Sequence, residues 1–424
     1  MASHSFQRIA MTSVHGYMDP TPQLGKVDTG GQVVYVLQLA RALARQGIAV
    51  DIYTRWFDRF KKQVEHVPGI PDVRVIRIRA GDWEFIPKER IYDLLPELSE
   101  NMRQFMVQHG LEYDLFHGHY VDGGMVALVL GEIFRKPVVY TAHSLGAWKR
   151  ASMKGDPVEL ENDYHFSHRI EEETRLLRQC HAVTLTSDLQ AEKIDELYDY
   201  QNGNIHLISC GADVRRFRPL REDEHELPKR LPPLYVFSLT RFDVYKGHDL
   251  LLEAFDKVRQ ELPEARLIIG GGTGNPCGNE KEVSEQIRAI IAEKTLGEHV
   301  RQIGYVPESM LAPYYRQARL FALPSRFEPF GMSAIEAMAC GTPVIASSSG
   351  GIREMIADGD NGLLVDATDA DAFAAAMLRL LRDKPEADRL GSAAAETVRK
   401  RYSWEAVAEQ FINCYTTAAE TAAK

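Results

Sequence analysis

The stretch RLFALPSRFEPFGMSAIEAMACGTPVIASS, residues 319–348, decides the fold class of this chain. It opens with an apolar run over 319–325 that is typical of a buried strand. A Pro-Phe-Gly turn then leads into SAIEAMA, which has the spacing of a helix, and a second apolar run follows over 342–348. A strand, a helix and a second strand in this order form the repeating unit of a parallel sheet. The stretch therefore predicts an α/β domain in which a helix starts at the carboxyl end of a strand.

The same alternation extends over both halves of the chain. In the second half we expect a helix over 248–262 and further strands over 234–241, 265–272 and 300–306. In the first half we expect a helix over 33–47 and strands over 8–14, 48–55, 73–80, 113–120, 137–144 and 181–187. This pattern is typical of doubly wound parallel sheets. We predict two Rossmann-like domains that face a cleft.

The predicted domain boundaries follow from a change in composition between the halves. Residues 213–233 are charged, contain prolines and lack hydrophobic periodicity, which indicates a linker. We expect a first domain over 1–212, a second over 234–400, and a helix over 401–424.

Composition limits the class of protein. The chain has 424 residues, 45% hydrophobic and 26% charged, with a net charge of −10, which disfavours a nucleic-acid partner. We expect no secretory signal, because the first residues lack an apolar segment and a cleavage site, and no apolar run is long enough to span a membrane, so we expect a cytoplasmic location. Five cysteines without paired spacing argue against a zinc site and for a reducing compartment.

Two carboxylates lie on either side of the predicted helix start. Glu328 precedes the turn, and Glu336 lies a little over one turn inside the helix. The amides of 330–332 begin the helix and are suited to bind an anion. Carboxylates accept hydrogen bonds from hydroxyl groups, so ribose and hexose hydroxyls beside a phosphate would match this arrangement. The pattern indicates a nucleotide-sugar site.

Glycines and cations follow other strands. Gly30 and Gly31 come after the first strand and open the first helix, where glycine allows close approach of a ligand. Arg241 and Lys246 follow the strand over 234–241, a suitable place for a diphosphate. By themselves, these two cations fit a solvated charged loop better than a ligand site.

Together, these motifs resemble the retaining nucleotide-sugar glycosyltransferases with the GT-B fold. The segment E328-PFGMSAI-E336, with EAMACGTPVIAS after it, is similar to the family's E-x7-E signature, and GGQVVYV, TAHSLG and the Arg241–Lys246 pair match as well. The resemblance covers nearly the whole chain. The segments GDWEFIPKE, HYVDGG, HSLGAWKR and YHFSHRIEEE further resemble bacterial sucrose-phosphate synthases of glycosyltransferase family 4, without their phosphatase domain. Mannosylfructose-phosphate synthases share much of this pattern.

The resemblance implies a role for each motif. It places the acceptor, fructose 6-phosphate, in the first domain and the donor, UDP-glucose or another NDP-glucose, mainly in the second. The acceptor residues it implies are Gly31, Gln32, Lys88, Tyr120, Ser144, Lys149 and Arg169, of which Lys88, Lys149 and Arg169 would bind the phosphate. The donor residues it implies are Gly31, Arg241, Lys246, Val306, Leu311, Glu328, Phe330, Gly331, Met332 and Glu336.

The implied reaction retains the anomeric configuration. His143 matches a family histidine beside the donor sugar, and we expect it to act with Arg241, Lys246 and Glu328 in catalysis. The departing phosphate would take the acceptor proton while the cations stabilise its charge. No cofactor is required and no bound catalytic metal is expected, although a divalent metal could stimulate the reaction. The DADAFA segment at 369–374 indicates a helix cap rather than a metal motif.

Several alternatives remain open at this point. The donor nucleotide can be UDP, ADP or GDP, and GDP-mannose would make the product mannosylfructose phosphate. Free fructose as acceptor is disfavoured because three cations would then lack an anion. A NAD-dependent oxidoreductase is disfavoured because GxGxxG is missing and the strand over 48–55 ends in Arg55 rather than an acid. A non-catalytic sugar-phosphate sensor is disfavoured by the full set of donor residues. A phosphorylated product would call for a separate phosphatase.

Overall fold

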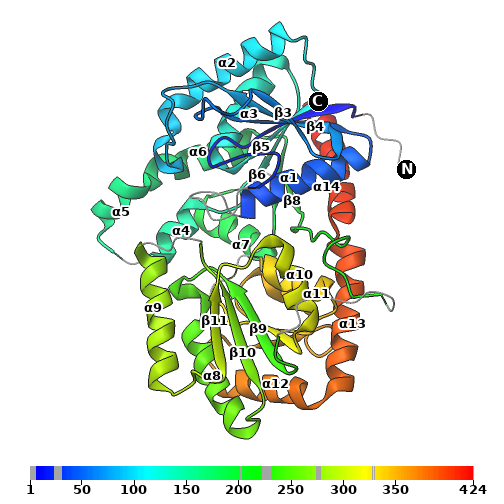
Figure 1. Ribbon diagram of the computed structural model, residues 1–424. Helices are drawn as coiled ribbons and strands as arrows, with labels where there is room; N and C mark the ends of the chain where they lie inside the picture. The colour runs from blue at the N-terminus through cyan, green and yellow to red at the C-terminus, as the bar shows by residue number, and fades with distance from the viewer. Residues whose placement is uncertain are drawn as a thin grey trace. The chain divides into compact units, whose positions relative to one another are not determined.

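The computed structural model describes residues 6–22, 31–153, 155–200, 203–221, 231–273, 278–326, 328 and 330–423. The chain forms two compact units, one made of Met1–Ser209 with Val407–Lys424 and the other of Cys210–Ala406 (Figure 1). Each unit contains its own parallel sheet with helices packed against it. Residues 222–230 of the predicted linker, and Gly30, lie outside the described residues.

The sheet of the first unit has eight strands in the order β3-β4-β2-β1-β5-β6-β7-β8. Its strands are β1 (Arg8–Thr12), β2 (Ala49–Arg55), β3 (Val64–Val67), β4 (Ile70–Ile78), β5 (Leu115–His119), β6 (Val138–Thr141), β7 (Ala182–Leu185) and β8 (Ile205–Leu207). All pairs are parallel except β3 with β4. The strand order reverses direction between β1 and β5, and ligands of such sheets bind at the carboxyl ends of the strands beside this reversal.

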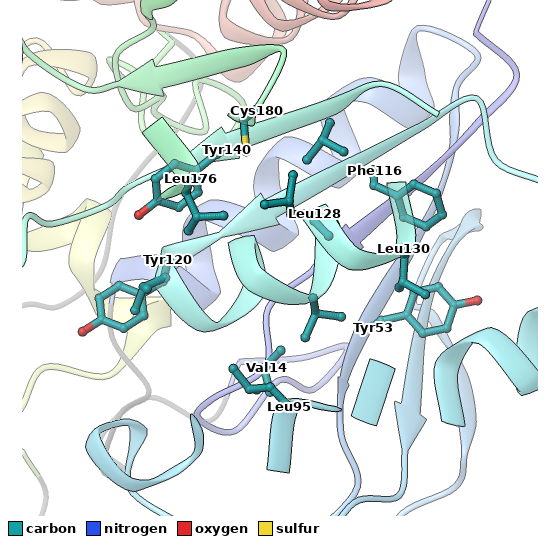
Figure 2. Packing of buried hydrophobic residues seen from close by; sticks show 14 of the residues in the cluster. Val14, Tyr53, Leu95, Phe116, Tyr120, Leu128, Leu130, Tyr140, Leu176 and Cys180 are labelled. Atoms are coloured by element: carbon teal, nitrogen blue, oxygen red, sulfur yellow. The ribbon is translucent and has the colours of Figure 1, made fainter. Parts of the chain in front are cut away.

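The helices of the first unit connect these strands. They are α1 (Gly31–Arg45), η1 (Lys88–Arg90), η2 (Tyr92–Leu94), α2 (Leu95–Gln108), α3 (Tyr120–Phe134), α4 (Gly146–Ser152), α5 (Pro157–Tyr164), α6 (Phe166–Gln179), α7 (Asp188–Leu197) and most of α14 (Trp404–Ala422). Helix α3 is buried on most sides, and its apolar residues form a core with the sheet (Figure 2). Figure 2 shows Tyr120 at the start of α3, on the same side as Tyr140 and Leu176.

The sheet of the second unit has six parallel strands in the order β11-β10-β9-β12-β13-β14. They are β9 (Tyr235–Thr240), β10 (Arg266–Gly271), β11 (Val300–Gly304), β12 (Leu320–Leu323), β13 (Val344–Ser347) and β14 (Leu363–Val365). Its helices are η3 (Val244–Lys246), α8 (His248–Glu261), α9 (Gly278–Glu293), α10 (Glu308–Gln317), α11 (Met332–Ala339), η4 (Gly351–Glu354), α12 (Ala370–Arg382) and α13 (Lys384–Arg401). Here the order reverses between β9 and β12.

The α/β fold and the expected strands and helices are confirmed, with three omissions. The short strands β3, β8 and β14 were not predicted. Each has three or four residues, which is too short for a period-two pattern to stand out from a loop. Most predicted strands are also shorter than expected; β5, for example, ends at His119, directly before α3 begins, and β6 ends at Thr141. Asp369 caps α12 as expected, since its Oδ1 accepts from the amide of Ala372 at 2.8 Å.

Candidate functional site

The predicted donor residues of the second unit gather at the reversal between β9 and β12. Arg241 directly follows β9 and is exposed, and Lys246 ends η3 a few residues later. Glu328 follows β12, ahead of α11. Because β9 and β12 are parallel neighbours, their carboxyl ends bring these residues to one edge of the sheet.

Lys246 and Glu328 form an ion pair at this edge. The Nζ of Lys246 donates to Oε2 of Glu328 at 2.8 Å, and Ser325 Oγ donates to the same oxygen at 3.3 Å. Both side chains are largely enclosed, with 11% and 13% of their surfaces exposed. A partly desolvated cation next to hydroxyl acceptors is suited to bind phosphate on one side and a sugar on the other. A bound phosphate would compete with Glu328 for the lysine.

A glycine holds the backbone of Glu328. Gly350 has φ 93° and ψ −164°, a conformation found almost only in glycine. A Cβ at this position would lie 2.0 Å from the carbonyl oxygen of Glu328, and that oxygen accepts from the amide of Gly351 at 3.0 Å. The SSSGG segment after β13 therefore fixes where the carboxylate emerges.

The start of α11 is built for an anion. Gly331 has φ 94° and precedes the helix, and its carbonyl accepts from the amides of Ala334 and Ile335 at 3.0 and 3.1 Å. The helix's own hydrogen bonds thus begin after the amides of Phe330, Gly331 and Met332, which lie at the positive end of the helix dipole. Phe330 is buried and anchors the turn.

Glu336 projects from α11 toward α10. The hydroxyl of Tyr315 donates to its Oε2 at 2.9 Å. Burial raises the pKa of Glu336 to about 7; the Tyr315 hydrogen bond and Arg216 lower it, and Glu308 raises it further. Val306 is buried just after β11, and Leu311 lies in α10, the helix that also carries Tyr315. The predicted donor residues Val306, Leu311 and Glu336 therefore belong to neighbouring elements.

The predicted acceptor residues lie in the first unit. Gly31 is exposed at the start of α1, and Gln32 donates through Nε2 to Ser13 Oγ at 3.3 Å. Ser13 comes directly after β1, so this contact ties the start of α1 to the carboxyl end of that strand.

Tyr120, Ser144 and Arg169 form one cluster. The guanidinium of Arg169 lies 4.7 Å from the centre of the Tyr120 ring and donates to both the carbonyl and Oγ of Ser144 at 3.0 Å. Arg169 is only 4% exposed and pairs with Glu173 at 2.7 Å. Glu173 also accepts from the amide of Gly146 at 2.8 Å. The predicted phosphate ligand Arg169 is therefore a buried, anchored cation rather than a surface one.

The other two predicted cations are more open. Lys88 begins η1, and its Nζ lies 3.3 Å from Oε1 of Glu89. Lys149 is in α4, with its Nζ 4.2 Å from the centre of the Tyr164 ring. Both side chains have partners that an incoming phosphate would replace or share.

His143 belongs to a group of rings that pack edge-on or tilted against one another. Its Nε2 lies 3.1 Å from Nδ1 of His119, and the Tyr35 ring packs edge-on at 4.9 Å. Burial, followed by the charge of His15, lowers the pKa of His143 to about 3, so its ring is neutral at pH 7. Both His143 (φ 55°) and Tyr120 (φ 63°) have left-handed backbones, a strained conformation that is common at functional sites.

Sequence reasoning missed several residues beside these. His15 pairs with Asp122, and Arg55 donates to the backbone carbonyls of Ala80, Glu84 and Asp82 at 2.8, 2.7 and 2.6 Å. Arg55 thereby holds the loop that leads to Lys88. Both His15 and Arg55 lie at the carboxyl ends of predicted buried strands, and this position could have indicated that they belong to the site. Their partners are remote in sequence.

Two further features concern the helices and the metal-ligating side chains of the described residues. None of their helices is both long and apolar enough to cross a membrane. No group of three or more His, Cys, Asp or Glu side chains that could hold a metal ion occurs among them.

Family models match both halves of the chain. Residues 29–216 match the model described as Glycosyltransferase Family 4, and residues 221–397 match Glycosyl transferases group 1. The first match includes the predicted acceptor residues, and the second includes the predicted donor residues other than Gly31.

Individual relatives are similar along their full lengths. The mannosylfructose-phosphate synthase of Agrobacterium fabrum is 36% identical over 96% of this chain and 90% of its own. A D-inositol 3-phosphate glycosyltransferase of Corynebacterium efficiens is 33% identical over 97% of this chain and 95% of its own. Among solved structures, the sucrose-phosphate synthase of Thermosynechococcus elongatus has a TM-score of 0.80 and 33% identity, covering 97% of this chain and 98% of its own.

Proposed function

Since this chain belongs to the family 4 glycosyltransferases and has their GT-B fold, we propose that it transfers glucose from UDP-glucose, or another NDP-glucose, to fructose 6-phosphate. The product would be sucrose 6-phosphate. The observation that carries the proposal is the anchored Arg169, which lies on Tyr120 and Ser144 at the carboxyl edge of the first sheet.

The choice of a phosphorylated acceptor rests on charge. Arg169 remains protonated because the pKa of its guanidinium, which burial lowers, is raised overall by Glu173. Lys88 and Lys149 add two further cations on elements of the same unit. The three relatives compared above are all named for a phosphorylated sugar or cyclitol. A neutral acceptor such as free fructose would leave these cations without an anionic partner.

The donor assignment rests on the second unit. Arg241, Lys246 and the first amides of α11 would bind the diphosphate, and Glu336 would accept hydrogen bonds from the ribose hydroxyls. Glu328 would orient the hexose once phosphate engages Lys246. As the bond to the anomeric carbon breaks, negative charge grows on the departing phosphate, and these preorganised donors stabilise it.

In this scheme the leaving phosphate accepts the proton of the acceptor hydroxyl. The hydroxyl of the acceptor attacks from the face that the diphosphate leaves, and the leaving phosphate oxygen takes the hydroxyl proton. The anomeric configuration is then retained without a covalent enzyme intermediate. His143, neutral at pH 7, can hydrogen-bond to the hexose without adding charge.

A second candidate function keeps the acceptor and changes the donor. Transfer of mannose from GDP-mannose would give mannosylfructose phosphate. The similarity to the Agrobacterium fabrum enzyme, at 36% identity, favours this alternative. Both reactions would use the same phosphate-binding residues.

A donor panel tests the proposal. Purified protein is mixed with fructose 6-phosphate and UDP-glucose, ADP-glucose, GDP-glucose or GDP-mannose, and nucleoside diphosphate release is followed. Free fructose and D-inositol 3-phosphate serve as comparison acceptors. We expect turnover with a glucose donor and fructose 6-phosphate only. Turnover with GDP-mannose alone would establish the second candidate, and turnover only with the inositol phosphate would overturn both.

A further inference from the structure

Glu173 places a buried negative charge inside the predicted acceptor cluster. The residue is 0% exposed. Its Oε1 accepts from Nε of Arg169 at 2.7 Å, and its Oε2 accepts from the amide of Gly146 at 2.8 Å and from the hydroxyl of Tyr198. A carboxylate that is removed from water is costly unless donors satisfy its oxygens, and here three donors do so.

The three donors belong to three different elements. Arg169 lies one turn earlier on α6, Gly146 begins α4, and α7 ends at Tyr198. The Tyr198 hydroxyl also accepts from the amide of Ala147 at 3.0 Å, so the first two amides of α4 reach Glu173 directly or through this one hydroxyl. Burial, followed by the charge of Glu173, raises the pKa of Tyr198, which therefore keeps the proton that it donates. Glu173 thus fixes the start of α4 relative to α6.

The packing around this carboxylate leaves no room for another side chain. A Cβ at Gly146 would lie 2.9 Å from Nε of Arg169 and 3.0 Å from Oε2 of Glu173. Because glycine has no Cβ, the backbone of α4 can approach the ion pair closely enough to donate to it. The position of α4 against the pair depends on this glycine.

The elements that Glu173 joins carry the predicted phosphate ligands. Arg169 donates through Nε to Glu173 and through Nη2 to the carbonyl and Oγ of Ser144, so one edge of its guanidinium is held by protein. Its third nitrogen, Nη1, has no hydrogen-bond partner within the described residues and is the one available to a phosphate. Ser144 lies just before α4, and Lys149 lies within it. A shift at the start of α4 would therefore move Ser144 and Lys149 together.

We propose that Glu173 is a positioning residue for the acceptor phosphate, because it aims Nη1 of Arg169 and sets where α4 presents Ser144 and Lys149. This inference rests on the proposed function, since it takes the acceptor to be a sugar phosphate bound by these residues. Glu173 acts through its neighbours, because protein donors occupy both of its oxygens. Its own charge repels a phosphate, so its contribution to the site is geometric.

The sign of one substitution separates positioning from a purely electrostatic role. Glu173→Gln keeps the size of the side chain and removes a negative charge beside the phosphate ligand. If Glu173 only tuned charge, the acceptor KM would fall, because the phosphate would meet less repulsion. If Glu173 positions Arg169 and α4, the acceptor KM should rise about tenfold or more, because an amide cannot accept hydrogen bonds at both ends. We expect this rise, with a smaller change in kcat and an unchanged donor KM.

Tyr198→Phe tests the contact with α4 separately. It removes the hydroxyl between Glu173 and the amide of Ala147, and it leaves the charge of Glu173 and its contact with Arg169 in place. We expect the acceptor KM to rise about two- to tenfold, as for the loss of one neutral hydrogen bond. Glu171→Gln is the matched control, because it removes the same charge from an exposed position on the same helix. Its acceptor KM should equal that of the wild type.

Thermal melting of each variant completes the experiment. A lower acceptor KM in Glu173→Gln would overturn the proposal. An unchanged acceptor KM together with a lower melting temperature would do the same, because Glu173 would then serve stability alone. If Glu173→Gln does not fold, Tyr198→Phe decides, and an acceptor KM equal to that of Glu171→Gln would reject the proposal.

The test also separates this inference from the proposed function. All acceptor KM values are measured with whichever sugar phosphate the wild type uses. Wild-type turnover with another sugar phosphate but not with fructose 6-phosphate would reject the proposed function alone, and the variants would still decide the role of Glu173. A wild type that turns over no sugar phosphate would overturn both.

Discussion

At the scale of single residues, the ion pair between Lys246 and Glu328 carries a kinetic prediction. Lys246→Ala removes a cation expected to stabilise the departing phosphate, so kcat should fall about 10²–10³-fold. The Lys257→Ala variant is a matched control, because Lys257 is an exposed lysine of α8 that pairs with Asp371. Initial rates at saturating donor and acceptor concentrations give kcat for the two variants. A near-normal kcat for Lys246→Ala would exclude Lys246 from leaving-group stabilisation.

The raised pKa of Glu336 predicts a pH dependence of donor binding. The ionised carboxylate accepts stronger hydrogen bonds from the ribose hydroxyls than the neutral acid does, so donor KM should rise as pH falls below about 7. Glu336→Gln should remove this dependence. The folding stability of the free protein depends on pH in the opposite sense. Because the pKa of Glu336 is raised from 4.5 to about 7, folding favours the neutral acid. The stability that this provides is lost as pH rises through 7. Glu336→Gln should therefore raise the melting temperature at pH 8 relative to the wild type.

Tyr315 provides a control for this assignment. Its hydroxyl donates to Glu336 and lowers the pKa of that carboxyl, so Tyr315→Phe should move the midpoint of the KM profile to higher pH. A midpoint that stays unchanged in both Tyr315→Phe and Glu336→Gln would assign the titration to another group.

At the scale of elements, the turn after β13 positions Glu328. Gly350→Ala would place a Cβ 2.0 Å from the Glu328 carbonyl in a backbone conformation that alanine rarely adopts. We expect this variant to lose about 1–3 kcal/mol more stability than Gly359→Ala, whose φ is also positive (78°) but whose Cβ meets nothing within 4 Å. Urea unfolding and kcat measured in parallel test this. Equal losses in the two variants would show that the turn does not hold Glu328.

The elements themselves were largely predictable from the sequence. The buried strands of parallel sheets are continuous apolar runs, so β1, β9 and β12 stand out from their surroundings. The strands that were not predicted, β3, β8 and β14, all lie at sheet edges and are three or four residues long. Pairing with a neighbouring strand, rather than their own pattern, makes them strands.

At the scale of the whole molecule, the chain returns to its first unit at its end. Val407–Lys424 belongs with Met1–Ser209, and Phe411 and Tyr415 pack there against His117. Phe411 is fully buried, so Phe411→Ala should cost about 3–5 kcal/mol of stability. Glu420→Ala, an exposed change in the same helix, should stay within about 0.5 kcal/mol. Equal melting temperatures for the two variants would contradict the packing of this helix as part of the first core.

The sequence by itself determined the α/β class, the order of the strands other than the short edge strands β3, β8 and β14, and the positions of Arg241, Lys246, Glu328 and Glu336 at strand ends and a helix start. These features depend on local periodicity and on turns of a few residues, which a linear pattern records. Only the tertiary structure decided that Arg169 is a buried cation, and that His15 and Asp122, 107 residues apart, form one pair. Burial and pairing of charges depend on which strands become neighbours in the sheet, and that neighbourhood is set by the packing of the whole unit.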